Sequence, residues 1–183
     1  DLHSQQVEGA FRIPMDNLLG LPLLTGKIAQ YYRDKKIVVV WPDDGMAHRA
    51  NEDKLLDVME PQFGYKPEVF HMRKVRKQVN VVDEIELEGD PKALEGSIVV
   101  MGDDMCDTGG TFRKAGEKLK QYGAREVLAC SSHGVFSGDA IEKFRNARVE
   151  VRGQLVRPID KIFVTDAIPL HRAKGDLIEV ISA

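Results

Sequence analysis

Two uninterrupted apolar runs stand out along the chain. IVVVW (37–41) and SIVVM (97–101) are rich in β-branched residues and bounded by charged or turn residues, a pattern that predicts strands buried on both faces. Each run leads into a segment rich in Asp and Gly. Shorter runs of the same kind predict further strands at 68–71, 127–131, 161–165 and 177–181.

Between these runs, apolar residues recur at helical spacing. In the segment 111–124, Phe112, Ala115 and Leu119 fall on one face, charged residues fall on the other, and Gly123 stands where a helix would stop. Similar patterns predict helices at 21–33, 49–59 and 139–146.

The alternation of strand and helix predicts an α/β fold with a mainly parallel sheet flanked by helices. Ligands of such sheets bind at the carboxyl ends of the strands. Residues 72–80 are polar and basic without a clear period and are predicted to form a mobile loop. With no repeat and no linker, residues 1–183 are interpreted as a single domain.

The charge balance narrows the class of partner. The formal net charge is −3, whereas proteins held to nucleic acid or an anionic membrane mainly by charge carry a basic excess. We therefore expect neither a nucleic acid nor a membrane as a partner. Two isolated cysteines form no disulfide framework or zinc motif, so a reducing compartment, the cytoplasm, is the expected location.

The segment from 97 to 119 is a buried strand, an acidic loop, and a Thr-Gly-Gly-Thr turn that opens a helix. Unpaired amides and the positive end of the helix dipole favour an anion there, and glycines let it approach the backbone closely. Thr108 and Thr111 add hydroxyl donors. The turn therefore predicts a phosphate site.

Two carboxylates beside such a turn need another partner, because Asp103 and Asp104 would repel a phosphate. They suit the hydroxyls of a sugar, so the arrangement predicts a site for ribose 5-phosphate. The alternative is that these two residues and Asp107 cap a helix and end a strand. One Asp would suffice for a cap, which favours the sugar.

These residues resemble a known family. DDMCDTGGT after a hydrophobic run is similar to the phosphoribosyl diphosphate loop of the type I phosphoribosyltransferase fold. Together with REVLACSSHGVFSGDA (125–140) and DLHSQQVEGAFRIPMDNL (1–18), it resembles the ribose-phosphate diphosphokinases. The resemblance runs from Asp1 to about Ile181. It implies transfer of the diphosphoryl group of ATP to the anomeric hydroxyl of ribose 5-phosphate, with Mg²⁺ and release of AMP.

The resemblance also implies roles for individual residues. His3 and Asp43 match residues near the magnesium of the nucleotide, and Lys74 and Arg76 match a basic catalytic pair. The residues matched to ribose 5-phosphate are Arg76, Asp103, Asp104, Asp107, Thr108, Gly109, Gly110 and Thr111. ATP and ribose 5-phosphate are the implied partners, and a homo-oligomer is expected.

Elementary chemistry agrees with a catalytic role for the basic pair, Lys74 and Arg76. Phosphoryl transfer asks a protein for positioning and for positive charge where negative charge develops, and Lys74 and Arg76 can supply both. Without the resemblance, RKVRK (73–77) would be interpreted as a solvated basic loop. A lone histidine such as His3 or His133 is more often structural than a ligand, and we expect His133 to hold a loop.

The sequence departs from the family pattern in places. The resemblance implies a preceding lobe in the family, which we expect to be absent from residues 1–183. Asp43-Asp44-Gly45-Met46 stands where the family commonly has Asp-Ala-Gly-Gly, and Glu8 stands where a Gln is usual near its regulatory phosphate site. Two alternatives follow: a phosphoribosyltransferase that consumes phosphoribosyl diphosphate, and a regulatory homologue without activity.

Overall fold

The computed structural model describes residues 1–42, 52–75, 84–170 and 175–183. The elements in chain order are η1 (Gln5–Ala10), α1 (Leu21–Tyr31), β1 (Ile37–Trp41), α3 (Glu52–Phe63), β2 (Glu68–Val75), β3 (Glu84–Glu88), η2 (Pro91–Leu94), β4 (Ile98–Cys106), α4 (Gly110–Gln121), β5 (Glu126–Gly134), α5 (Ala140–Asn146), β6 (Val149–Val151), β7 (Gln154–Val156), β8 (Lys161–Thr165) and β9 (Ile178–Ile181).

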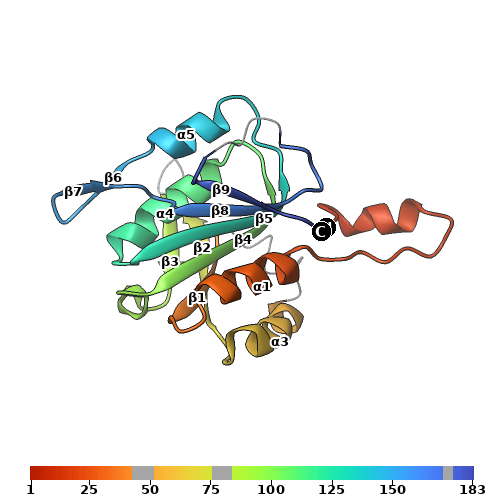
Figure 1. The fold of residues 1–183 in the computed structure, drawn as a ribbon, viewed down its shortest axis with the longest axis horizontal. Helices are drawn as coiled ribbons and strands as arrows, with labels where there is room; N and C mark the ends of the chain where they lie inside the picture. Colours follow the sequence, from red (N-terminus) through yellow and green to blue (C-terminus); the bar gives the residue numbers. More distant parts are fainter. Residues whose placement is uncertain (43–51, 76–83, 171–174) are drawn as a thin grey trace.

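Within these residues, one seven-stranded sheet has the order β3-β2-β1-β4-β5-β8-β9 (Figure 1). Its strands pair in parallel except β3, which pairs antiparallel with β2 at the edge. A separate antiparallel hairpin, β6–β7, projects from the body (Figure 1). The predicted α/β class with a mainly parallel sheet is confirmed.

The helices cover both faces of the sheet, with α1 and α3 on one and α4 and α5 on the other (Figure 1). Side chains of β1 alternate between the two cores: Ile37, Val39 and Trp41 pack with α1 and α3, while Val38 and Val40 pack with α4. Because both faces of these strands are buried, their sequences are continuous apolar runs.

The predicted strands at 37–41 and 161–165 have the observed bounds, and the strand at 177–181 begins one residue later. Those predicted at 68–71, 97–101 and 127–131 extend further toward their carboxyl ends. The four predicted helices are present with small shifts at their ends, and for the helix at 49–59 the described part begins at Glu52.

Two predictions need correction. Residues 72–75, predicted as part of a mobile loop, belong to β2 because β3 pairs with them, from Met72 opposite Leu87 to Val75 opposite Glu84. Residues 76–80 lie outside the described residues. Asp103 and Asp104, placed by the sequence in a loop, belong to β4, because β5 pairs alongside it as far as Cys106 opposite Gly134.

Candidate functional site

The sheet order has a topological switch point between β1 and β4. From β1 the sheet is extended on one side by β2 and β3, and on the other side by β4 and then β5. The order in which strands are added therefore reverses between β1 and β4. Ligands of open α/β sheets bind at such switch points, outside the carboxyl ends of the strands. The ends of β1, β2, β4 and β5 share this edge because these strands are parallel.

The phosphate turn (residues 107–111) links the end of β4 to the start of α4 at this edge. Gly109 is the N-cap of α4 with φ of 69°, a left-handed conformation that favours glycine. A Cβ on Gly109 would lie 2.3 Å from the ring of Phe144, so no larger residue fits. At Gly110 the space is open, the nearest atom being Thr108 Oγ1 at 3.8 Å.

This backbone leaves donors available for an anion. The helix closes with the amide of Arg113 donating to the carbonyl of Gly109 at 3.0 Å. The amides before it in the first turn of α4 have no acceptor within the helix, and glycine provides no capping side chain. Asp107 and Thr108 are exposed, and Thr111 is half-buried. The turn can therefore receive a phosphate oxygen from solvent.

The two carboxylates that precede the turn face different surroundings. Along β4, Val99 and Met101 pack with α4 while Ile98 and Val100 pack with α1 and α3. Alternation from Met101 puts Asp103 on the α4 side, and the contact with His3 puts Asp104 on the α1 side. The alternation does not continue to the end of the strand, because Cys106 packs in the α4-side core. Asp103 is half-buried, whereas Asp104 is 3% exposed.

The first residues of the chain pack against the α1 side of this edge. The backbone N–H of Gly20 donates to Asp1 Oδ2 at 2.9 Å, and the hydroxyl of Ser132 also donates to that carboxylate. The Nε2–H of His133 donates to the carbonyl oxygen of Asp1 at 2.8 Å. Burial lowers the pKa of His133, which favours its neutral form. These contacts agree with a structural role for His133.

His3 reaches the same place. Its Nδ1 lies 2.8 Å from Oδ2 of Asp104, a contact that joins residues 101 positions apart. Ser132 and Asp1 did not stand out in the sequence as site residues. A serine in a strand and an aspartate at the chain start carry no local signal, and only the tertiary structure brings them together.

Of the basic pair, Lys74 and Arg76, the structure describes only the first. Lys74 is the penultimate residue of β2, and its backbone pairs with Ile85 of β3. Because β2 is parallel to β1, this backbone lies toward the carboxyl edge. Arg76 and Asp43 lie outside the described residues, as does Met46. The structure thus brings together the predicted residues His3, Asp103, Asp104 and 107–111 at one edge, with the backbone of Lys74 on the same edge.

Both cysteines lie in the α/β core beside the site and are buried. Burial, with the carboxylates of Asp103 and Asp107 adding to it, raises the pKa of the Cys106 thiol to about 12. Burial and Asp103 likewise raise the pKa of Cys130 to about 12. Both groups are therefore thiols at neutral pH, and the thiolate is the reactive form.

We therefore expect a thiol reagent such as dithionitrobenzoate to label neither cysteine of the native protein at about pH 8. The same reagent should label both after unfolding in guanidinium chloride, which is the internal control. Rapid labelling of the native chain at either position would contradict the burial and the pKa direction assigned to these groups.

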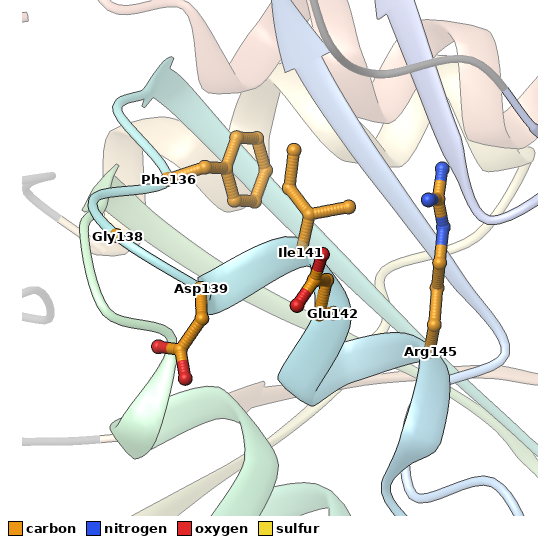
Figure 2. Close-up of a pocket in the computed structure, with 6 residues that line it drawn as sticks. All are labelled: Phe136, Gly138, Asp139, Ile141, Glu142 and Arg145. Atoms are coloured by element: carbon orange, nitrogen blue, oxygen red, sulfur yellow. The ribbon is translucent and has the colours of Figure 1, made fainter.

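A pocket lies close by, where the loop after β5 enters α5 (Figure 2). It is lined by Phe136, Gly138, Asp139, Ile141, Glu142 and Arg145. Phe136 packs edge-on against Phe144, the ring that contacts Gly109. Two carboxylates against one guanidinium make this pocket a poor phosphate site.

Among the described residues, no group of three or more His, Cys, Asp or Glu side chains is arranged to hold a metal ion. Magnesium in nucleotide enzymes is commonly bound through one or two carboxylates and the phosphates of the substrate. In the part of the chain that the structure describes, there is also no helix of the length and apolarity needed to cross a membrane.

Comparison with known proteins gives concordant matches. A ribose-phosphate pyrophosphokinase of Caldanaerobacter subterraneus subsp. tengcongensis is 37% identical over 189 residues, covering 100% of this chain and 51% of the relative. The ribose-phosphate pyrophosphokinases of Aquifex aeolicus and a Marinomonas species are 32% and 39% identical, with 52% and 47% of their lengths covered. The chain spans about half the length of the curated relatives it matches.

A solved structure gives a concordant match. The crystal structure of phosphoribosylpyrophosphate synthetase from Mycobacterium smegmatis matches 100% of this chain and 52% of its own chain, with a TM-score of 0.76 and 28% identity. This match confirms the predicted type I phosphoribosyltransferase-like fold. The profile of the family described as phosphoribosyl synthetase-associated domain matches residues 45–180. The chain belongs to the phosphoribosyl synthetase-associated domain family.

Proposed function

We propose that this chain is the catalytic lobe of a ribose-phosphate diphosphokinase. The observation that carries the proposal is the carboxyl end of β4, where a half-buried carboxylate, Asp103, shortly precedes an uncapped glycine turn that opens α4. A phosphate and a neighbouring diol are the two ends of ribose 5-phosphate, and they match these two groups in charge and hydrogen bonding.

In the proposed reaction, the anomeric hydroxyl oxygen of ribose 5-phosphate attacks the β-phosphorus of ATP. A new bond forms between that oxygen and the β-phosphorus, and the bond from the β-phosphorus to the oxygen shared with the α-phosphate breaks. AMP leaves with that oxygen, and the hydroxyl proton passes to solvent or a nearby base. The products are phosphoribosyl diphosphate and AMP.

The turn and Asp103 would bind and orient the sugar phosphate. Amides of residues 109–111 and the hydroxyls of Thr108 and Thr111 would hold the 5-phosphate, which fixes the ribose with its anomeric carbon directed outward from the turn. Such orientation contributes to the rate because the two reactants meet in a productive geometry.

Lys74 and Arg76 would act on the migrating diphosphoryl group. Both would supply positive charge where negative charge develops, Lys74 as a point charge and Arg76 as a planar fork. The position of Lys74 at the end of β2 supports this role, because β2 ends at the same edge as β4. Arg76 would also contact ribose 5-phosphate.

Magnesium would enter with ATP, and when bound it would neutralise charge on the transferring phosphates. His3 and Asp43 are the residues proposed near it. Imidazole is a less favoured partner than oxygen for magnesium, so His3 would meet the nucleotide complex and need not ligate the metal directly. The expected homo-oligomer also belongs to this proposal, and light scattering of the purified chain would test it.

A coupled assay with Mg-ATP and ribose 5-phosphate tests the function. Because the chain spans about half of its relatives, it should be assayed alone and also fused to the part of the Caldanaerobacter relative that it does not match. AMP formed in equal amount to phosphoribosyl diphosphate, in either form, supports the proposal.

Two other outcomes would contradict it. Pyrophosphate release that depends on an added base and phosphoribosyl diphosphate would identify a phosphoribosyltransferase. Neither product from either form, together with stable binding to an active synthetase, would identify a regulatory homologue.

A further inference from the structure

A second cavity lies at the opposite end of α4 from the phosphate turn, beside the β6–β7 hairpin (Figure 1). Its volume is about 210 Å³, and we call it the hairpin pocket. The twelve residues of α4 place about 18 Å between the phosphate turn and this end of the helix. The pocket is lined by Lys120 and residues 123–125 on one side, and by Val151, Arg152, Gln154 and Val156 of the hairpin on the other.

One wall of the hairpin pocket is apolar because the hairpin has two different faces. Val149 lies opposite Val156, and Val151 lies opposite Gln154, so these four side chains share one face. Val149 is buried at the end of this face where β6 contacts α4. Further along the face, Val151 and Val156 are half-buried and line the pocket. A ligand in the pocket can therefore bury an apolar group against these two valines.

The remaining walls are cationic. Lys120, Arg125 and Arg152 line the pocket, and none of the described residues that line it is acidic. The side chain of Lys120 is 8% exposed, lies 2.7 Å from the carboxylate of Asp160, and donates to the carbonyl oxygen of Arg125 at 2.9 Å. These two contacts occupy two of the three N–H donors of the ammonium group, which leaves the third for a ligand.

The two arginines have weak partners that an anion can displace. Arg152 pairs with Glu95 at 2.9 Å, but the two side chains are 79% and 63% exposed. Arg125 pairs with Glu126 at 3.6 Å, and the same carboxylate also accepts from the hydroxyl of Tyr32. Ion pairs of such exposed side chains contribute little to stability. Both guanidinium groups are therefore available to a ligand in the pocket.

Arg152 also occupies a backbone position that is unfavourable for arginine. It is the first residue of the two-residue turn Arg152-Gly153, and the φ angles of the turn are 51° and 80°. Hairpin turns with positive φ at both positions favour Asn, Asp or Gly. Strain of this kind in folded proteins is concentrated at functional positions, so the conformation points to a use for the guanidinium group.

We propose that the hairpin pocket binds a small organic anion in which a phosphate or carboxylate group is joined to an apolar group about the size of one ring. The anionic group meets Arg125, Arg152 and the third donor of Lys120, while the apolar group lies against Val151 and Val156. The pocket is smaller than the roughly 300–1,000 Å³ of sites for drug-sized ligands, which limits the ligand to this size. This site is independent of the proposed function, because it lies at the other end of α4.

Titration of the ¹⁵N-labelled chain with phenyl phosphate, followed through the amide shifts, tests the proposal. The amides of residues 123–125 and 151–156 should shift together and saturate with a Kd of about 1–10 mM, the range typical of so small a ligand. The amides of residues 107–111 are fitted separately, because the phosphate turn can bind the same anion. Absence of saturable shifts around the hairpin pocket would overturn the proposal, whatever happens at the turn.

Two further probes separate the contributions of charge and apolar surface. Inorganic phosphate lacks the ring and should bind the hairpin pocket at least about fivefold more weakly than phenyl phosphate. Benzoate carries the ring on a carboxylate, and the tighter of the two aromatic anions identifies the preferred anionic group. Equal affinity for inorganic phosphate and both aromatic anions would contradict the apolar wall assigned to the pocket.

Two variants locate the binding on the arginines. Arg152→Gly removes the guanidinium group and suits the positive φ, so the hairpin should stay folded. Arg152→Gly and Arg125→Gln should each weaken phenyl phosphate binding about fivefold, roughly the worth of one exposed charge pair. Arg33→Gln is the matched control, since Arg33 is exposed just after α1, which covers the other face of the sheet. It should leave the Kd within about twofold at physiological ionic strength. An unchanged Kd in both pocket variants would refute the site.

Discussion

Lys74→Ala is expected to lower kcat for diphosphoryl transfer by about 10²- to 10³-fold, because one preorganised charge at the transition state is worth roughly that factor. The KM for ribose 5-phosphate should change much less, since the turn and Asp103 hold the sugar phosphate independently of this lysine. Steady-state kinetics of the form found active in the coupled assay measures both quantities.

Lys92→Ala is the matched control for this variant. Lys92 is exposed in η2, which precedes β4 and therefore lies toward the opposite edge of the sheet. Its replacement should leave kcat within about twofold, as surface substitutions away from a site usually do. A Lys74→Ala enzyme that retained near-normal turnover would refute the catalytic role of this residue.

Gly109→Ala should destabilise the fold by about 2–4 kcal/mol. The left-handed backbone at φ of 69° costs a residue with a Cβ about 1–2 kcal/mol, and the new methyl would meet the Phe144 ring at 2.3 Å. In a chain of this size such a loss corresponds to a Tm lower by roughly 5–15 °C, which calorimetry would measure.

Gly110→Ala is the control, one residue further along the same turn. Its Cβ would meet open space, and alanine is a better helix former than glycine, so Tm should stay the same or rise slightly. If Gly109→Ala were as stable as Gly110→Ala, the conformation assigned to the phosphate turn would be wrong.

Most strands of the sheet could be predicted from the sequence, because a strand buried on both faces is a continuous apolar run. IVVVW is buried throughout, and the strand it predicted has the observed bounds. The edge strand β3 was missed because EIELE mixes three acidic residues with two apolar ones. Ile85 and Leu87 pack on the core, so β3 carries only half of the apolar signal of an inner strand.

Two other features depended on pairing that sequence does not display. β4 continues through Asp103 and Asp104 because β5 runs alongside it, although Asp and Gly are typical of loops. The β6–β7 hairpin turns at Arg152 and Gly153, both with positive φ, and its strands have three residues each. Strands that short carry no periodicity.

The candidate site likewise has a part that the sequence predicts and a part that only the tertiary structure shows. The residues of the phosphate turn are contiguous, so their chemistry could be predicted from local pattern alone. The contact of His3 with Asp104 spans 101 positions and exists only because the first residues fold back onto the α1 side of the edge. Proximity in sequence joined Asp103 and Asp104, whereas alternation along a strand separates them.

A crystal structure of this chain with ribose 5-phosphate tests the central claim most directly. The account predicts the phosphate within hydrogen-bond distance of the first amides of α4 and the hydroxyls of Thr108 and Thr111, with the ring hydroxyls on Asp103. Sugar phosphate bound at another part of the molecule, with the turn left empty at saturating ligand, would contradict it.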